Sequence, residues 1–453
     1  MLQALLDAIG AHRADAALSA SDGRTLGRAD LLAHAVGFGD RLPPLGPGDI
    51  WIGVADHLTH TVAALGALGL ADTVLLDPGT VVATAEGLPR PARVITDRAD
   101  TALARWAADR GLLTVVDRAG AGTPGPARRP RPDTALKFLT SGTTGAPKVI
   151  EHHARQVLAA TQGVAERLRL GSQDVSLTLT AQNHTLGFIT GVLTPLASGG
   201  SVAFGDLAEP ATLAARIATS GATWCAASPA IHLLVLDVSR RAGFRWPGLR
   251  FLRSSAAPLT ADTAGALEEH FGVPAINAYV LTEAPGEAAS QFVDEPRTPG
   301  TVGRPSLCEI EIRDGVVCLR GPNVTGPPGW FATGDLGTFD RSGALTILGR
   351  RDDLINRGGF KIPPHTVEAA ALRHPHIAEA AAFPVPHAQL GDAVGLVVTA
   401  RRPHVLSVAD VRNHLRTQLS RRMWPDRIVV TDEIPRNQRG KIARRTLAGL
   451  LLP

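Results

Sequence analysis

Cysteine is scarce in this chain of 453 residues: only Cys225, Cys308 and Cys318 occur, and none of them forms a Cys-x-x-Cys pair. Zinc and dithiol redox motifs are therefore unsupported, and an odd, low count fits a reducing cytosol. No apolar run is long enough to cross a bilayer, and the N-terminus lacks the basic and then apolar pattern of a secretion signal. We expect a soluble, cytoplasmic protein with no membrane partner.

Long runs of one charge are also missing. Lys and Arg number 46 and Asp and Glu number 42, so the formal charge is only +4, and the positive residues are thinly spread. Nucleic-acid binding normally needs a basic patch or stripe, so we expect no nucleic-acid partner. The modest basic balance still suits an anionic small substrate.

Two familiar catalytic motifs are absent. The chain's single Gly-Lys pair, Gly440-Lys441, is followed by Ile and lacks the upstream glycine of a Walker A motif, and Gly-x-Ser-x-Gly does not occur. Gly120, Gly122 and Gly125 match G-x-G-x-x-G, but PARRPRP follows them where a dinucleotide site requires a helix. A Walker-type nucleotide site, a dinucleotide fold and a nucleophile elbow are thus excluded.

The patterns that are present alternate between strand and helix up to about residue 285, which predicts layered α/β subdomains. A β-rich section follows, with EIEIRDGVVCLRG and ALTILGR. After residue 352 the pattern restarts as a small α+β unit. The predicted fold class is therefore α/β, with a large N-terminal domain, a β-rich subdomain and a small C-terminal domain.

The stretch LKFLTSGTTGAPKVI, residues 136–150, combines hydroxyls, glycines and one cation between two strand-like runs. Main-chain N–H groups of a glycine-rich turn form an anion site, hydroxyls add donors without bulk, and Lys148 adds a full charge. These features are what a polyphosphate needs. An ordinary flexible turn is the alternative for the stretch alone.

Five motifs occur in order: TSGTTGAPK (140–148), NAYVLTE (277–283), TGD (333–335), GRRDDLINRGGFKI (349–362) and PRNQRGKI (435–442). With RSSAAPL and GTVGRP they resemble the adenylate-forming superfamily of acyl- and aryl-CoA synthetases, non-ribosomal peptide synthetase adenylation domains and luciferases, over nearly the whole chain. The resemblance implies an adenylation core, residues 1–351, and a mobile C-terminal domain, residues 352–453, with ATP bound between them. It also implies that a carboxylate is joined to AMP, releasing pyrophosphate, and that a thiol then displaces AMP.

The resemblance places the nucleotide on several of these motifs. The β- and γ-phosphates would lie in the loop of Thr140, Ser141, Gly142, Thr143, Thr144, Gly145 and Lys148; the adenosine would lie against Ala256, Ala257, Pro258, Asn277, Ala278 and Tyr279. Tyr279 offers a flat ring for adenine, although a core aromatic is the alternative. Thr282 would donate to the α-phosphate, and Glu283 is a hard oxygen ligand for Mg²⁺. Asp335 and Arg350 would bind the ribose hydroxyls.

The C-terminal motifs carry the remaining implied roles. Lys441 would bridge the substrate carboxylate and the α-phosphate, because a positioned cation relieves the repulsion of two anions in the transition state. A solvated surface lysine is the alternative. Asp352 falls at the family's hinge, and Gly358 and Gly359 would line the tunnel for the thiol.

The acid pocket would contain Asn183, His184, Ser255 and Val280. AQNH and INRGGFKI resemble segments of aryl-acid adenylating enzymes, so an aryl acid is a modest lead; a buried polar pair is the alternative for Asn183 and His184. No Asp lies between Leu177 and Val202 to bind an α-amine. Ser255 and Val280 replace usual glycines and add bulk, so we expect a small carboxylic acid.

The acceptor stays open between coenzyme A, the phosphopantetheine of an acyl or peptidyl carrier protein, and an amine. Arg401, Arg402, Arg421 and Arg422 suit a nucleotide 3′-phosphate or an acidic carrier helix, and solvated surface charge is the alternative. The main hypothesis is an AMP-forming acid–thiol ligase. The rivals are an adenylating enzyme with a non-thiol acceptor and a catalytically silent nucleotide-binding homologue, which would have no need of Lys441.

Overall fold

The computed structural model describes residues 2–12, 16–38, 42–77, 88–116, 134–141, 147–401, 403–435, 442 and 444–451. The chain forms two compact units. The first comprises Met1–Ile310, Leu319–Phe331 and Arg341–Leu345, and the second comprises Glu311–Cys318, Ala332–Asp340 and Thr346–Pro453. Among the described helices, none is long and apolar enough to cross a lipid bilayer.

A six-stranded sheet in the first unit carries the glycine-rich hairpin. Its order is β6-β5-β3-β4-β7-β8, with strands β3 (Asp49–Ile52), β4 (Thr73–Leu75), β5 (Pro91–Thr96), β6 (Leu113–Val115), β7 (Leu136–Ser141) and β8 (Pro147–His152). The strands from β6 to β7 are parallel and β8 runs antiparallel to β7. The predicted pair of strands around the loop is therefore present.

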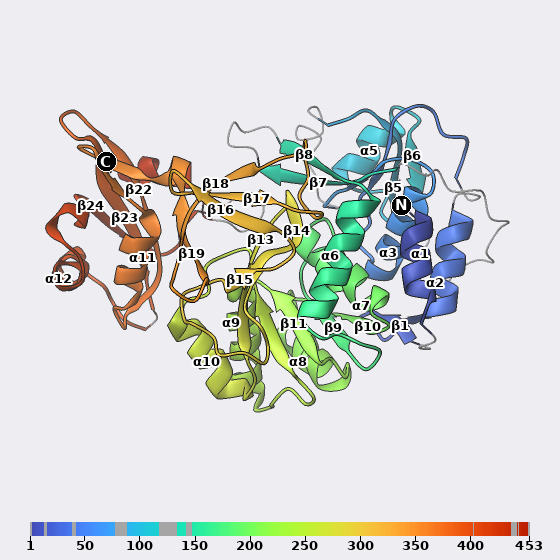
Figure 1. The fold of residues 1–453 in the computed structure, drawn as a ribbon, viewed down its shortest axis with the longest axis horizontal. Coiled ribbons are helices and arrows are strands. Elements are labelled where there is room, and N and C mark those ends of the chain that lie inside the picture. Colours follow the sequence, from blue (N-terminus) through green and yellow to red (C-terminus); the bar gives the residue numbers. More distant parts are fainter. Residues whose placement is uncertain are drawn as a thin grey trace. The chain divides into compact units, whose positions relative to one another are not determined.

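A nine-stranded sheet forms the rest of the first unit's framework (Figure 1). Its order is β15-β14-β13-β12-β11-β9-β10-β1-β2, with strands β1 (Ala16–Ser19), β2 (Thr25–Gly27), β9 (Val175–Thr178), β10 (Ser201–Phe204), β11 (Trp224–Ala227), β12 (Phe251–Ser254), β13 (Ala275–Leu281), β14 (Ala284–Ser290) and β15 (Arg304–Pro305). The strands from β1 to β13 in this order are parallel, while β2, β14 and β15 pair antiparallel with their neighbours.

Helices cover both faces of the nine-stranded sheet. On one face pack α8 (Pro210–Thr219), α9 (Pro229–Ala242) and α10 (Ala261–Phe271). On the other pack α6 (Ala154–Arg167) and the π-helix η2 (Leu186–Leu193). The remaining described helices of this unit are α1 (Leu2–Gly10), α2 (Arg28–Val36), α3 (His57–Leu68), α5 (Ala102–Ala108) and α7 (Thr194–Ala197).

Local sequence signals explain where several of these helices begin and end. Ser228 caps α9 by accepting a hydrogen bond from the Ile231 backbone, Pro229 occupies the first turn, and Gly243 ends the helix in the left-handed conformation. Thr260 and Gly272 perform the same two functions for α10. These caps set the ends of the two helices that precede β12 and β13, the strands that carry two of the motifs.

The second unit contains most of a four-stranded sheet and all of a five-stranded one. The first has the order β16-β17-β18-β19, with bounds Glu309–Arg313, Val316–Arg320, Phe331–Phe339 and Leu345–Arg350. The second has the order β21-β20-β23-β22 with β24 beside β23, and its strands are β20 (Ile355–Arg357), β21 (Phe360–Ile362), β22 (Ile377–His387), β23 (Gly391–Ala400) and β24 (Arg427–Thr431). Helices are η3 (Arg351–Asp353), α11 (Pro364–Leu372), α12 (Val408–Gln418), η4 (Arg421–Met423), α13 (Arg444–Leu447) and η5 (Ala448–Leu451).

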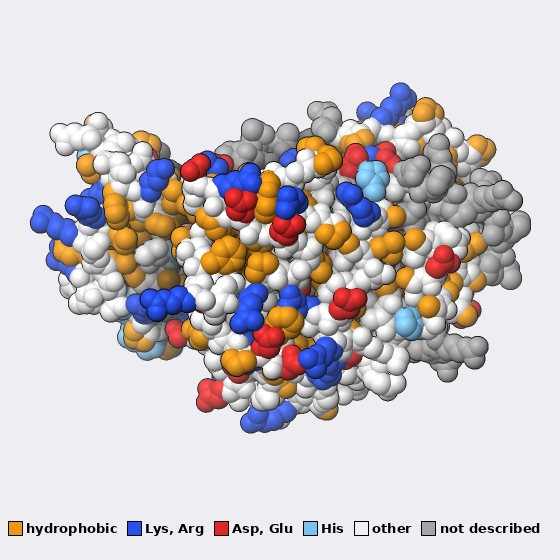
Figure 2. All heavy atoms as spheres, in the orientation of Figure 1, with side chains coloured by type: hydrophobic (Ala, Val, Ile, Leu, Met, Phe, Trp, Pro, Cys, Tyr) orange, Lys and Arg blue, Asp and Glu red, His pale blue; other side chains and the backbone are white. Residues whose placement is uncertain are grey.

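Over the described part of the first unit, the face drawn in Figure 2 shows Lys and Arg side chains interspersed with Asp and Glu. The layered α/β first unit and the small α+β second unit agree with the fold class predicted from the sequence.

Candidate active site

The stem of the glycine-rich loop is a regular antiparallel hairpin. Thr140 on β7 pairs with Lys148 on β8, and the Thr140 hydroxyl donates to the Lys148 carbonyl at 3.4 Å. Gly142, Thr143, Thr144 and Gly145 lie outside the described residues, as does the side chain of Ser141. The hairpin holds the first hydroxyl and the cation of the motif on facing strands.

Lys148 lies beside the acidic end of the second motif. Its Nζ is 3.9 Å from Oε1 of Glu283, two residues after the end of β13. The backbone N–H of Thr325 donates to the Glu283 carbonyl at 2.8 Å, and the Thr325 hydroxyl lies 2.7 Å from Nδ1 of His152 at the end of β8. Burial lowers the pKa of His152 to about 4. A neutral histidine and one threonine thus tie the hairpin to the Thr282-Glu283 pair.

The residues of β13 that were predicted to contact adenosine are largely buried. Asn277 donates from Nδ2 to the Thr301 carbonyl at 3.0 Å, and its backbone N–H donates to Oε1 of Gln291 at 3.0 Å. Ala278 is buried, and Tyr279 is only 8% exposed. Most of the tyrosine ring therefore packs against protein, and its stacking on adenine stays a prediction.

The turn after β12 is strained. Ala256 adopts φ +67°, a left-handed conformation that is costly for a residue with a Cβ and that often marks functional sites. Ala256, Ala257 and Pro258 are exposed, whereas Ser255 is 1% exposed. The Ser255 hydroxyl has no hydrogen-bond partner among the described residues. Sequence patterns did not reveal this strain, because alanine rarely adopts positive φ.

Asn183 and His184 are both half-buried and precede the π-helix η2. Within the described part of the chain, the buried Oδ1 of Asn183 has no partner. A π-helix is rare and frequently found at functional sites. Both the pocket role and the alternative of a buried polar pair therefore stay open for Asn183 and His184. The sequence did not indicate the π-helix.

Asp335 and Arg350 come together in the second unit. Oδ1 of Asp335 lies 3.4 Å from Nη1 of Arg350, and the Thr333 hydroxyl accepts from the Asp335 backbone at 3.0 Å. Gly334 has φ +77°, and a Cβ there would lie 3.0 Å from the Arg350 guanidinium. The positive φ is what favours glycine in TGD, since the Arg350 guanidinium ends a flexible, half-exposed side chain that can shift away from a Cβ.

The predicted hinge residue and the predicted tunnel residues also lie in the second unit, in short segments between its strands. Asp352 is exposed within the short helix η3. Gly358 and Gly359 connect β20 to β21 with φ +58° and +85°. Lys441 lies outside the described residues. No described group of three or more His, Cys, Asp or Glu side chains is arranged to hold a metal ion, so Mg²⁺ at Glu283 remains a prediction.

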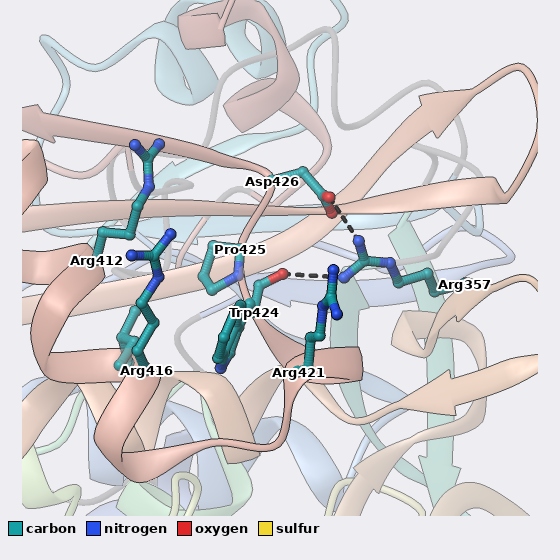
Figure 3. Close-up of a pocket in the computed structure, with 8 residues that line it drawn as sticks. Arg357, Arg412, Arg416, Arg421, Trp424, Pro425 and Asp426 are labelled. Atoms are coloured by element: carbon teal, nitrogen blue, oxygen red, sulfur yellow. Dashed lines mark hydrogen bonds and ion pairs between the residues drawn. The ribbon is translucent and has the colours of Figure 1, made fainter.

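The second unit contains a cavity lined largely by arginines, which the sequence analysis did not predict as a site. It has a volume of about 170 Å³ and is lined by Arg357, Arg412, Leu415, Arg416, Arg421, Trp424, Pro425 and Asp426. Asp426 and the Trp424 carbonyl hold Arg357, while the guanidinium of Arg416 lies 5.3 Å from the Trp424 ring (Figure 3). Of the arginines proposed for an anionic acceptor only Arg421 lines it; Arg402 lies outside the described residues.

Comparisons with known proteins bear on this arrangement. The model of the AMP-binding enzyme family matches residues 70–326, and that of the AMP-binding enzyme C-terminal domain matches residues 366–441. A probable CoA ligase, CCL9 of Humulus lupulus, is 34% identical over 70% of this chain and 66% of its own length. The oxalate–CoA ligase of Arabidopsis thaliana is 34% identical over 70% of this chain and 68% of its own length.

A solved structure shows the same fold. ATP-bound MatB from Rhodopseudomonas palustris superposes with a TM-score of 0.86 at 23% identity, over 99% of both chains. The match confirms the predicted fold. The matched segment spans about two thirds of the length of these curated relatives. This chain therefore belongs to the family of AMP-binding enzymes, the adenylate-forming superfamily that its motifs resemble.

Proposed function

We propose that this protein joins a small carboxylic acid to AMP, with release of pyrophosphate, and then transfers the acyl group to the thiol of coenzyme A. One observation carries the proposal: the cation of the glycine-rich hairpin, Lys148, lies 3.9 Å from the Glu283 carboxylate. A triphosphate needs both a cation and a metal-binding oxygen at one place. The relatives named as CoA ligases favour the thiol acceptor.

The chain's own residues divide this chemistry between them. Lys148 and the hydroxyls of the loop bind the β- and γ-phosphates, and Thr282 donates to the α-phosphate. Glu283 supplies an oxygen ligand to Mg²⁺, which when bound neutralises the pyrophosphate. Asp335 accepts hydrogen bonds from the ribose hydroxyls and Arg350 holds that carboxylate in place. Lys441 offsets the repulsion between the attacking carboxylate and the α-phosphate.

We further propose that the functional boundary falls at Asp352, with residues 1–351 as the adenylation core and residues 352–453 as the domain that brings Lys441. Gly358 and Gly359 then line the path of the thiol. The arginine-rich cavity around Trp424 suits an anionic part of the acceptor, because guanidinium groups bind phosphate and carboxylate with several donors. The three free, buried cysteines suit the reducing cytoplasm as its location.

The first test is a screen for acid-dependent exchange of radioactive pyrophosphate into ATP, over aryl, short aliphatic and β-amino acids. Exchange with a small acid and little with palmitate is expected. If no acid supports exchange, the result contradicts the proposal and favours a nucleotide-binding protein without catalytic activity.

The second test identifies the acceptor. Incubation with ATP, the active acid and coenzyme A should give the acyl-CoA thioester by mass spectrometry. A carrier protein bearing phosphopantetheine and a panel of amines are offered in parallel, and a product with either alone would replace coenzyme A as the acceptor.

A further inference from the structure

A buried cluster of charges lies on the η2 face of the nine-stranded sheet. The Arg253 Nη2 on β12 is 3.1 Å from Oε2 of Glu287 on β14, and both side chains are 0% exposed. Arg167 of α6 reaches the same carboxylate, with Nε 3.4 Å from Oε1, and is 11% exposed. Two guanidinium groups thus share one carboxylate, and the cluster carries a net charge of +1.

The two members of the buried pair are not equally satisfied. Both Glu287 oxygens are engaged, since Oε1 also accepts from the Ser306 hydroxyl. Arg253 uses only Nη2, which donates to the Gly286 carbonyl at 2.8 Å and to Glu287 at 3.1 Å. Its Nε and Nη1 are buried and have no partner in the described part of the chain. One side of the guanidinium therefore presents two unused donors.

Another buried arginine of the same chain shows how a structural guanidinium is accommodated. Arg28, 4% exposed, donates to three carbonyls, those of Ile9, Leu196 and Gly200, at 2.7–3.1 Å through its two terminal nitrogens. Only Nε of Arg28 is left without a described partner. Arg253 differs because a terminal nitrogen, the strongest donor position for a planar anion, is unused as well.

The position of Arg253 connects it to the proposed acid pocket. Side chains alternate along a strand, so Arg253 shares a face of β12 with Phe251 and leads toward Ser255, two residues further on. Phe251 packs in one cluster with Leu186 of η2, the helix that Asn183 and His184 precede. The unpartnered Ser255 hydroxyl belongs to the residue that follows β12, and the unpartnered Asn183 Oδ1 lies three residues before η2. Arg253 therefore lies on the strand that leads to Ser255, on the sheet face that packs against the helix following Asn183 and His184.

We infer that Arg253 binds a second anionic group of the acid substrate, so that this enzyme activates short acids with two negative groups, such as dicarboxylates or sulfonated carboxylates. The inference rests on the proposed function. A dianionic acid supplies the negative charge that the cluster lacks and accepts from the unused nitrogens of Arg253. A neutral-tailed acid of equal length leaves those donors buried and unpaired, and such a loss discriminates strongly between substrates.

The wild-type protein provides the first test, through pyrophosphate exchange with acids matched in length: oxalate and acetate, malonate and propanoate, succinate and butanoate, with sulfoacetate as the sulfonate arm. In at least one pair we expect kcat/KM for the dianionic acid to exceed that of its partner by about a hundredfold or more. If kcat/KM for the neutral-tailed acids equals or exceeds that for the dianionic acids in every pair, the inference is overturned and the proposed function is unaffected. No exchange with any of these short acids also overturns the inference, whereas the proposed function is overturned only if the wider panel of aryl, short aliphatic and β-amino acids gives no exchange either.

Variants separate a specificity residue from a structural one. Arg253→Met with Glu287→Gln removes both charges of the fully buried pair, while Arg167 stays charged and the new amide oxygen can still accept from Arg167 and Ser306. We expect the preference ratio of this double variant for dianionic over neutral-tailed acids to fall at least about thirtyfold, mainly through a higher KM. Arg253→Lys, which keeps the charge, should retain part of the preference. Arg28→Met is the matched control, and its ratio should equal that of the wild type.

If the charge cluster only stabilises the fold, the variants should behave differently. The double variant and Arg28→Met would then both lose thermal stability while their preference ratios stayed unchanged, and that outcome overturns the inference. If the double variant does not fold, Arg253→Lys and the wild-type acid panel still decide the question.

Discussion

The ammonium of Lys148 lies 3.9 Å from Oε1 of Glu283, and this pair joins the glycine-rich hairpin to the end of β13. The Lys148 side chain is 62% exposed and that of Glu283 is 21% exposed, so water screens their attraction. The pair therefore adds little to folding stability. Its placement suits a ligand with phosphate oxygens for the cation and a metal ion for the carboxylate.

Lys148→Ala should accordingly separate activity from stability. We expect pyrophosphate exchange to fall by about tenfold or more, because a charged donor to the phosphates is lost. The free energy of unfolding in urea should change by less than about 1 kcal/mol, the usual limit for an exposed ion pair. Arg169→Ala, which breaks the exposed Arg169–Asp294 pair, is the control and should leave both quantities unchanged. Full exchange by Lys148→Ala would remove Lys148 from the site.

Lys441→Ala should lower acid-dependent adenylate formation by at least about a hundredfold, which is the usual effect of removing one donor that stabilises charge in the transition state. The physical reason is the repulsion between the substrate carboxylate and the α-phosphate. Lys361→Ala, an exposed lysine of β21, serves as the control. Near-normal exchange by Lys441→Ala would refute the assigned role, and an equal loss in both variants would show that the effect is not specific to Lys441.

Ser255→Gly and Val280→Gly should widen the range of acids accepted. Ser255 is buried, Val280 is half-buried, and both replace glycines of the family pattern, so each adds bulk near the proposed pocket. Each variant should raise kcat/KM for hexanoate relative to butanoate by roughly tenfold, since one methylene in a pocket is worth tenfold or more. Ser239→Ala removes another buried serine hydroxyl, from α9, and should leave the ratio unchanged. A ratio unchanged in both glycine variants would place these residues outside the pocket.

Local patterns made much of this fold predictable. The alternating runs on either side of residues 142–146 indicated two strands, and β7 and β8 form the expected hairpin. The TGD turn and Arg350 belong to motifs close in sequence, and the structure brings Asp335 and Arg350 within 3.4 Å. Each of these features depends on short-range periodicity or on a motif whose glycine fixes the backbone.

Other features depend on how strands are ordered, which no local pattern encodes. Arg253 and Glu287 meet because β12 lies beside β13 and β13 beside β14. Arg357 and Asp426 meet because β20 and β24 both lie beside β23. A sequence shows each of these as a lone charge, and a lone charge is usually a solvated one. Burial and pairing emerge only once the sheet is assembled.

Three buried histidines should make the first unit sensitive to mild acid. Burial lowers the pKa of His60, His152 and His232 from 6.5 to about 4. Between these values the unfolded chain binds protons that the folded one does not, so stability is fully present above pH 6.5 and is lost as pH falls toward 4. Each histidine should contribute a slope of up to about 1.4 kcal/mol per pH unit in that window.

His60→Leu tests this dependence. His60 is buried near Phe188, with ring centroids 6.3 Å apart, so leucine can occupy an apolar site there. Urea unfolding at pH 7, 6 and 5 should show a smaller loss of stability on acidification in the variant, whatever its stability at pH 7. The exposed His153, replaced by Gln, is the control and should follow the wild-type slope. An unchanged slope in His60→Leu would mean that His60 is protonated in the folded protein at these pH values, and that its burial does not keep it neutral.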